Sequence, residues 1–330
     1  MLVVKEVGSK EEWTKNLQKC NNVNIFSTWE WGDFKSHGWR VERLAFYKGT
    51  SFVGQTQIAF KEKLGYRLGW SSSGISFVEG KYLKDIIDSL KNHYNFLKTV
   101  IRFNFFDNAI GSNCFTFDSI EDLKKVSFSV NSGYTVRYNF CDIEKVEPAL
   151  YTKNNRYYLK KALKIDQVAQ VEDFEIDNFK KVHDDMSEVK SKLDLVVSKD
   201  ELVRLKDIFG DRLKMFTVRI EGEIVCASLV ILFDGHAYYF LAGSNDKGRS
   251  SYSAFLMIDY ILKFLKDSEV KKFDFGGISP FLQSVSGINR FKMGFGGEVT
   301  HYIGERNLTD SKWLNFIFNI IVKVKLKDRS

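Results

Sequence analysis

A turn at residues 243–251 (GSNDKGRSS) has the residue types of a phosphate-binding site. It lies between a predicted strand and a predicted helix, and the free N–H groups at a helix N-terminus attract anions. Its second glycine would allow an anion to approach closely, and its lysine and arginine add positive charge. The run matches neither GxxxxGK[ST] nor GxGxxG, so an ordinary capped turn is an equally good interpretation. The residues concerned are Gly243, Ser244, Lys247, Gly248 and Arg249.

A second candidate, residues 271–298, holds a lysine between two Phe-Gly-Gly turns. Paired glycines mark places where the backbone bends sharply or closely approaches another group, although tight turns in a sheet protein also contain them. Lys292 stands between Phe291 and Met293, so it is either a surface lysine with a buried stem or a charge held inside a cleft. The glycines concerned are Gly276, Gly277, Gly296 and Gly297.

Other reactive groups give weaker signals. A predicted helix at residues 152–164 carries Arg156, Lys160 and Lys164 on one face, which is either a solvated face or a phosphate-binding stripe. His183 precedes two aspartates, but adjacent residues of a helix point in different directions, so no metal site is predicted. HExxH and GxSxG motifs are absent from the sequence. An enzyme with this sequence would therefore act mainly by positioning and electrostatics.

The composition excludes several classes of protein. With 330 residues, 44% hydrophobic and 28% charged, the chain is neither disordered nor a coiled-coil rod, and its length predicts about two domains. A net charge of +7 allows an anionic partner, such as a nucleotide, a tRNA or an acidic headgroup, but predicts no DNA-binding domain. The longest apolar run, residues 224–233, is too short to span a membrane, and no secretory signal is evident, so we expect a cytoplasmic protein. The four cysteines lack CxxC spacing, and we expect them to be reduced and buried: Cys20, Cys114, Cys141 and Cys226.

The elements that would position these groups repeat along the chain. After predicted helices beginning at Ser9 and spanning 26–39, each half has a hairpin, a strand, a helix and a closing strand. Gly49 and Gly222 occupy equivalent hairpin turns, 173 residues apart. The repeat predicts an α+β fold of two similar domains with mixed, mostly antiparallel sheets, at residues 1–150 and 151–330. The predicted strands and helices are 41–47, 52–61, 66–70, 83–97 and 99–106, then 215–220, 224–233, 237–241, 252–265 and 271–275.

Four runs resemble the Fem-type aminoacyltransferases that build peptidoglycan cross-bridges, and their relatives among the acyl-CoA N-acyltransferases. They are FSTWEWGDFKSHGW at 26–39, RYYLKKALK at 156–164, DFGGISP at 274–280 and GINRFKMGFGGE at 287–298. The resemblance covers nearly the whole chain and implies a tandem of two N-acetyltransferase-like domains, which agrees with the repeat. No segment between the halves is long enough for the helical arm of some members, so an armless member is expected.

The resemblance implies roles for individual residues. Lys35 matches the lysine that contacts the phosphates of a UDP-linked peptide acceptor, and we add Trp31 and Arg156 to the predicted acceptor-binding residues. Lys292 matches the lysine beside the transferred aminoacyl group, which makes it the predicted catalytic residue. The turn at residues 243–249 stands where N-acetyltransferases hold the pyrophosphate of coenzyme A, but it lacks their [RQ]xxGx[GA] run.

We therefore expect an acyltransferase in which an amine of a cell-envelope precursor attacks an activated ester or thioester. The predicted donor is aminoacyl-tRNA or acyl-CoA, used as a co-substrate, and no bound cofactor or metal is predicted. The predicted acceptor is a UDP-linked or lipid-linked sugar or peptide, such as a peptidoglycan peptide or a surface-polysaccharide amino sugar. The alternatives are an acyl-CoA-dependent N-acyltransferase of surface polysaccharide and a degenerate acyltransferase that only binds its ligand.

The C-terminal segment, residues 311–330, reads as a helix with a narrow polar stripe and a wide apolar face. It carries five basic residues and one acid. We expect it either to pack into the second domain or to hold the protein peripherally against the inner, anionic face of a membrane.

Overall fold

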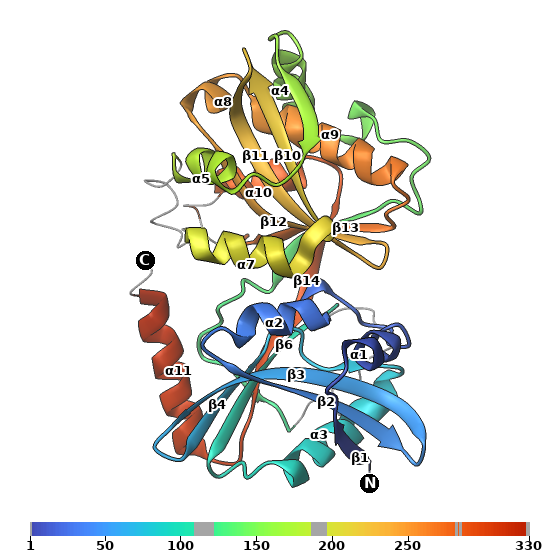
Figure 1. Ribbon diagram of the computed structural model, residues 1–330, viewed down its shortest axis with the longest axis vertical. Helices are drawn as coiled ribbons and strands as arrows, with labels where there is room; N and C mark the ends of the chain where they lie inside the picture. Colours follow the sequence, from blue (N-terminus) through green and yellow to red (C-terminus); the bar gives the residue numbers. More distant parts are fainter. Residues whose placement is uncertain (1, 109–121, 186–196, 281–282, 284–285, 328–330) are drawn as a thin grey trace. The chain divides into compact units, whose positions relative to one another are not determined.

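The structure, a computed structural model, describes residues 2–108, 122–185, 197–280, 283 and 286–327. The chain forms two compact units, each with its own sheet and flanking helices (Figure 1). Unit 1 contains Met1–Gly133 and His301–Asp328, and unit 2 contains Tyr134–Thr300.

The sheet of unit 1 has the strand order β1-β2-β3-β4-β6-β14. Its neighbours are antiparallel except β4 and β6, which are parallel, and the short strands β5 and β7 pair with β3 and β14. The strands are β1 (Val3–Glu6), β2 (Arg40–Lys48), β3 (Ser51–Lys63), β4 (Tyr66–Ser71), β5 (Ser76–Phe77), β6 (Thr99–Asn108), β7 (Lys124–Lys125) and β14 (Glu298–Leu308). The helices are α1 (Lys10–Leu17), α2 (Trp29–Ser36), α3 (Leu83–His93) and α11 (Lys312–Lys327), with 3-10 turns η1 (Ile25–Ser27) and η2 (Gly80–Tyr82).

Unit 2 repeats this order, as β9-β10-β11-β12-β13-β8, again with one parallel pair, between β12 and β13. Its strands are β8 (Tyr134–Asn139), β9 (Val168–Glu172), β10 (Leu213–Ile220), β11 (Glu223–Phe233), β12 (His236–Ser244) and β13 (Lys272–Ile278). Its helices are α4 (Lys153–Ala162), α5 (Ile176–Asp184), α7 (Lys199–Phe209), α8 (Asp246–Ser250), α9 (Ser253–Asp267) and α10 (Ser286–Met293), with 3-10 turns η4 (Pro148–Leu150) and η5 (Gly210–Arg212). The predicted α+β repeat is confirmed.

The last strand of each sheet comes from an unexpected part of the chain. β8 directly follows unit 1 in sequence but pairs with β13 in unit 2, whereas β14 follows unit 2 and pairs with β6 in unit 1. The predicted boundary at 150/151 is therefore wrong, and the C-terminal helix belongs to the first unit rather than the second. The partner of a strand is set by pairing across the sheet, which sequence order alone does not determine.

Local signals explain most element boundaries. Gly49 and Gly222 both have a positive φ, of 60° and 81°, at the predicted hairpin turns. The helix predicted at 26–39 is instead the turn η1 followed by α2. The break falls at Thr28, whose extended backbone stops the first turn and whose Oγ1 accepts a hydrogen bond from Trp31 N–H at 3.3 Å.

Each unit has one main apolar core. In unit 1, α3 packs its apolar face on the sheet, and in unit 2 the long helix α9 does the same. Of the cysteines, Cys20 and Cys226 are buried, whereas Cys141 is exposed in the turn after β8, contrary to the prediction. Cys114 lies outside the described residues.

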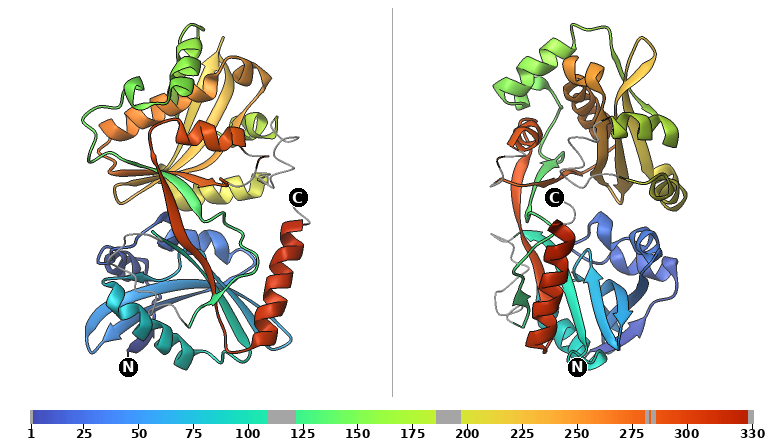
Figure 2. Two further views of the ribbon diagram at one scale, coloured as in Figure 1. Left: turned by 180° about the vertical axis from the view of Figure 1, so that it is seen from behind. Right: turned by 90° about the vertical axis from the view of Figure 1, so that its left-hand side faces the viewer.

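The C-terminal helix α11 lies along the sheet of unit 1 (Figure 2). Leu314, Phe318 and Val322 contact Val100 of β6, together with side chains of β4. Val100 and the core residue Ile101 are adjacent in the strand and point to opposite faces, so α11 covers the face opposite α3. Within the described ranges, no helix combines the length and the apolar character needed to cross a bilayer.

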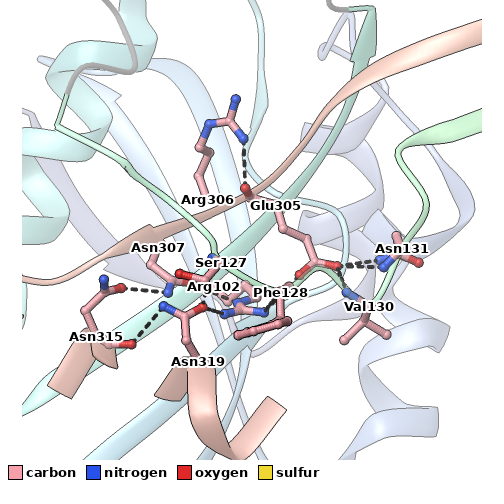
Figure 3. Close-up of polar contacts among 10 residues, drawn as sticks. All are labelled: Arg102, Ser127, Phe128, Val130, Asn131, Glu305, Arg306, Asn307, Asn315 and Asn319. Atoms are coloured by element: carbon pink, nitrogen blue, oxygen red, sulfur yellow. Dashed lines mark hydrogen bonds and ion pairs between the residues drawn. The ribbon is translucent and has the colours of Figure 1, made fainter. Parts of the chain in front are cut away.

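A buried polar network fastens α11 to the sheet (Figure 3). Arg102 of β6 is fully buried and donates to Glu305 at 3.1 Å, Asn307 at 2.9 Å and Asn319 of α11 at 2.8 Å. Glu305 accepts further bonds from the backbone N–H groups of residues 130 and 131, both at 2.8 Å. Because the charges of Arg102 and Glu305 both have hydrogen-bond partners, they can be buried at a lower cost in free energy. The bonds of Arg102 to Asn319 and to β14 fix the position of α11 on the sheet.

Candidate active site

The parallel strands β12 and β13 of unit 2 separate halfway along their length. They pair at three positions, of which the last joins Tyr238 to Asp274. From there β12 continues along β11, and β13 continues along β8. Separated strands leave facing backbone groups that no longer bond to each other, and such an edge suits an extended, amide-bearing ligand.

A bulge in β13 lies where the strands separate. The register with β8 shifts between Asp274 and Gly277, and Gly276 has a φ of 73°, a conformation that favours glycine. Asp274 Oδ1 holds the bulge, because it accepts bonds from Gly276 N–H at 2.8 Å and Thr135 Oγ1 at 2.5 Å. The first Phe-Gly-Gly turn is thus a fixed bend in a strand.

Lys292 reaches this bulge from α10. Its Nζ donates to Gly277 O at 3.0 Å, and the side chain is half-buried. Burial lowers the pKa of Lys292 to about 8, although the nearby Asp274 carboxylate opposes the shift. The structure places the Lys292 ammonium against the backbone of the bulge, and an ammonium there can stabilise a developing negative charge.

Tyr238 and Arg137 complete the cluster, and the sequence analysis missed both. A methyl group at Gly276 would lie 3.5 Å from Tyr238 Oη and 3.8 Å from Lys292 Nζ, so both groups lie within reach of the bulge. Burial and the Asp274 charge raise the pKa of Tyr238, which therefore keeps its proton. Arg137 Nε lies 3.5 Å from Asp274 Oδ2. The aspartate directly before Phe-Gly-Gly was a signal for a side chain that bonds the turn backbone.

The second Phe-Gly-Gly turn has a packing role. Gly296 has a φ of 89°, and a Cβ there would lie 2.5 Å from Leu150 O. A Cβ at Gly297 would lie 2.8 Å from Arg137 O. These two glycines let the chain after α10 pass against β8 and η4, whereas Gly276 and Gly277 lie at Lys292.

Lys35 and Trp31, two of the predicted acceptor-binding residues, lie together on α2 in unit 1. Lys35 Nζ is 5.0 Å from the centroid of the Trp31 ring and 5.3 Å from that of Phe34, and Lys35 is half-buried. The buried Trp31 ring in turn packs edge-on against Phe26, with 4.7 Å between centroids. The aromatic faces favour the lysine charge at this position.

The rest of the WGDFK run positions α2 on the sheet. A Cβ at Gly32 would lie 2.3 Å from Gln57 Oε1, so only glycine allows the helix so close to β3. Asp33 forms an ion pair with Arg43 at 2.6 Å. Arg156, the third predicted acceptor-binding residue, belongs to unit 2, where it is exposed on α4 and donates to Ala149 O at 3.3 Å.

At the predicted phosphate-binding turn, local contacts engage the groups expected to bind an anion. Gly248 N–H donates to Asn245 Oδ1 at 2.8 Å, and Lys247 pairs with Glu221 at 2.6 Å. Arg249 pairs with Asp246 and donates to Ser244 O. A Cβ at Gly248 would lie 2.2 Å from Val225 O, and one at Gly243 2.6 Å from His183 Cα, so both glycines serve close packing. Donor binding at this turn stays a prediction.

A pocket of about 530 Å³ lies in unit 2 among α4, α9 and α10. Its wall combines aromatic and polar side chains, and it includes none of the predicted site residues. The lining residues are Thr152, Asn154, Asn155, Tyr158, Phe255, Gly287, Arg290, Phe291, Met293 and Gly294.

The described residues contain no group of three or more His, Cys, Asp or Glu side chains arranged to hold a metal ion. His183 is buried, and its ring lies 5.4 Å from that of Phe179, so it is part of the packing of α5.

Comparisons with known proteins agree with this geometry. Residues 215–323 match the model of the FemAB family, a segment that contains β12, β13 and α10. The chain is similar to the crystal structure of FemX, with a TM-score of 0.79, 15% identity, and coverage of 96% of this chain and 100% of that one. The predicted resemblance to the Fem-type family is confirmed. A search of curated proteins gave no match.

Two further structures extend the likeness in fold. L-PGS from Bacillus licheniformis gives a TM-score of 0.55 at 13% identity, covering 96% of this chain and 98% of that chain. A tandem GNAT protein from the clavulanic acid biosynthesis pathway gives 0.53 at 9% identity, with 93% and 98% covered. The predicted fold, two N-acetyltransferase-like domains in tandem, is confirmed.

Proposed function

We propose that this protein is an acyltransferase that forms an amide bond on a cell-envelope precursor. The observation that carries the proposal is Lys292, a half-buried lysine with a pKa of about 8 at the bulge where β12 and β13 separate. The FemAB match supports it, because the matched segment contains all three elements of this site.

The reaction needs little from the protein beyond alignment and charge. The acceptor nitrogen attacks the carbonyl carbon of the donor, so that a C–N bond forms and the carbonyl oxygen becomes an oxyanion. The C–O or C–S bond to the leaving group then breaks, the nitrogen loses a proton, and the leaving atom gains one. Alignment of the two reactants contributes about 7 to 11 kcal/mol without a protein nucleophile.

Lys292 stabilises the oxyanion in this scheme. Its ammonium is partly removed from water, which is why its pKa is lowered, so its interaction with a nearby oxyanion is stronger than in bulk water. Tyr238, which keeps its proton because its pKa is raised, is suited to donate a hydrogen bond to the developing negative charge. The facing backbone groups of β12 and β13 would bind the amide-bearing part of the substrate.

For the donor, we favour aminoacyl-tRNA over acyl-CoA. The turn that would hold the pyrophosphate of coenzyme A uses its amide and its cations in local bonds, most directly Gly248 N–H to Asn245 and Lys247 to Glu221. An acyl-CoA-dependent N-acyltransferase of surface polysaccharide remains the alternative. Aminoacyl-tRNA and acyl-CoA are both present in the cytoplasm, so we assign the reaction to the cytoplasm.

The acceptor would carry phosphate, as UDP-linked and lipid-linked precursors do. Lys35 is the candidate phosphate ligand, because the rings of Trp31 and Phe34 hold its ammonium at a defined position on α2.

The test is transfer of a labelled acyl group by the purified protein. Aminoacyl-tRNA and acyl-CoA are supplied separately, each with UDP-linked and lipid-linked amine acceptors. We expect amide product with aminoacyl-tRNA, and loss of product in Lys292→Met but not in Lys206→Met, an exposed lysine of α7. If acceptor binds but neither donor yields product, the protein is a degenerate acyltransferase that only binds ligand, and the proposal fails.

The donor site is tested by two matched substitutions in unit 2. Lys247→Ala removes a cation from the predicted turn, and Arg290→Ala removes one from the pocket wall. A rise in donor KM for Lys247→Ala alone would support the turn, whereas a rise for Arg290→Ala alone would assign donor binding to the pocket.

A further inference from the structure

The outer face of α11 is apolar and exposed. Its inner face is buried on the sheet, but Trp313, Phe316, Ile320 and Val324 form a continuous row on the other side, with Phe316 63% exposed. Their spacing of three or four residues places them on one stripe of the helix. Single exposed apolar residues are ordinary, but a row of four large ones on one helix is not.

The β3–β4 hairpin adds a leucine held in an unfavourable backbone conformation. Leu64 is 89% exposed at the tip, with a φ of 53°, and Gly65 follows with a φ of 76°. Such a turn normally has asparagine or aspartate before its glycine, because these residues tolerate positive φ. A leucine at this position adopts a strained backbone conformation and makes no contact with the core. We infer that its side chain has a role at the surface.

The hairpin and α11 are neighbours. The ring of Tyr66 lies 5.8 Å from that of Trp313. The turn after α3 bonds to the hairpin and to the residue before α11, and its Leu97 is 68% exposed. Lys98 O in this turn accepts a bond from the hairpin, and Phe96 O accepts one from Asp310 N–H, just before α11. We call the surface formed by these side chains the apolar face: Leu64, Tyr66, Leu97, Trp313, Phe316, Ile320 and Val324.

Positive charge surrounds the apolar face. Residues 61–67, 94–98 and 310–324 carry six basic residues and two acidic ones, and one of the acids, Glu62, pairs with Arg67 at 3.0 Å. The basic residues are Lys61, Lys63, Arg67, Lys98, Lys312 and Lys323. A surface of this kind, with exposed Trp, Tyr and Leu side chains next to flexible lysines, favours the interface of an anionic bilayer.

We propose that the apolar face docks unit 1 on an anionic lipid bilayer, with Leu64 and the outer row of α11 in the headgroup region. The inner row of α11 stays on the sheet, so no part of the fold opens. Lipid contact would lower the exposure of every residue in the face, and the lysines would lie at the phosphate level. This docking goes beyond the transfer reaction and needs neither donor nor acceptor.

The test is co-sedimentation of the full chain with vesicles of phosphatidylcholine alone or mixed with phosphatidylglycerol. We expect binding to the mixed vesicles only, and weaker binding at 0.5 M salt than at 0.05 M. Leu64→Asn should weaken binding about tenfold while suiting the turn better than leucine does. Phe316→Gln should have a similar effect, and Leu163→Asn, at an exposed leucine of unit 2, should have none.

Three results would overturn the docking. The first is no sedimentation with either kind of vesicle, and the second is unchanged binding in a folded Leu64→Asn variant. The third is a dimer in light scattering that Leu64→Asn and Phe316→Gln both abolish, which would assign the face to a second copy of the chain. Thermal melts of each variant show whether it is folded.

Discussion

The fifth strand in the sheet order of each unit, β6 in unit 1 and β13 in unit 2, pairs differently with its parallel neighbour. In unit 1, β4 and β6 pair at five positions, from Arg67 with Thr99 to Ser71 with Phe103. In unit 2, β12 and β13 pair at only three before they separate. One copy of the fold is thus closed at the place where the other is open.

The charged side chain near this strand is more deeply buried in unit 1 than in unit 2. Arg102 in β6 is fully buried, and its guanidinium bonds Glu305, Asn307 and Asn319. In unit 2 the corresponding strand is β13, and Lys292 reaches its bulge from α10. Lys292 is half-buried, and its pKa is lowered to about 8. The difference suggests that unit 1 uses its buried charge for stability, whereas unit 2 keeps a reactive charge accessible to substrate.

The largest expected effect is on the stability of unit 1. Glu305→Ala should lower the free energy of unfolding by about 3 to 5 kcal/mol, because it leaves Arg102 buried without a counter-charge. Chemical unfolding in urea measures the change. The double variant Arg102→Met/Glu305→Ala should recover part of the loss, and Lys84→Ala, which breaks an exposed pair with Asp88, should have little effect. If Glu305→Ala is as stable as the wild type, the network does not hold unit 1 together.

The next effect is on turnover in unit 2. Lys292→Met should lower kcat at least about tenfold, since loss of one donor to an oxyanion commonly costs about 2.7 to 4 kcal/mol. Its stability should equal or exceed that of the wild type, because the variant no longer buries a charge. Wild-type turnover in Lys292→Met would refute the catalytic role, and a large loss of stability would remove the contrast between the units.

The pH dependence follows from the same lysine. Only protonated Lys292 stabilises an oxyanion, so kcat/KM should fall as the pH rises through about 8, by about tenfold per unit beyond it. In Lys292→Arg the falling limb should move to higher pH. The lowered pKa also means that stability contributed through this group rises between pH 8 and the ordinary lysine range, where the unfolded chain binds more protons. A kcat/KM that instead rises through pH 8 in the wild type and not in Lys292→Arg would make Lys292 a base.

The smallest effect is on acceptor binding. Lys35→Ala should raise the acceptor KM about fivefold, equivalent to about 1 kcal/mol, with donor KM unchanged. Lys15→Ala, at an exposed lysine of α1 in the same unit, is the control. An acceptor KM that does not change would leave Lys35 as a lysine held on aromatic rings without a ligand role.

Local patterns in the sequence predicted the repeated elements well. The β-rich runs on either side of Gly49 and Gly222 predicted both hairpins, and the periodicity of α3 and α9 predicted both helices between parallel strands. The sequence also singled out Lys292, because two Phe-Gly-Gly turns bracket its segment, and its catalytic role stays a prediction. These signals depend on residues within a few positions of one another.

Features that depend on distant residues were missed. Arg102 and Glu305 form an ion pair although 203 positions separate them in the sequence, and no residue next to either one indicates the pairing. Tyr238, Asp274 and Arg137 come from three strands and meet only after β8 has paired with β13. The glycines at 243–249 do not distinguish packing from anion binding, because both require the same small residue.

The exchange of last strands also affects how the chain is made. β6 ends at Asn108, but β14, which covers its edge, begins only at Glu298. At about 5 to 20 residues per second, a ribosome needs roughly 10 to 40 s to synthesise the intervening chain. During that time the edge of β6 is open to pairing with other chains, so nascent unit 1 depends on fast completion or on chaperone cover.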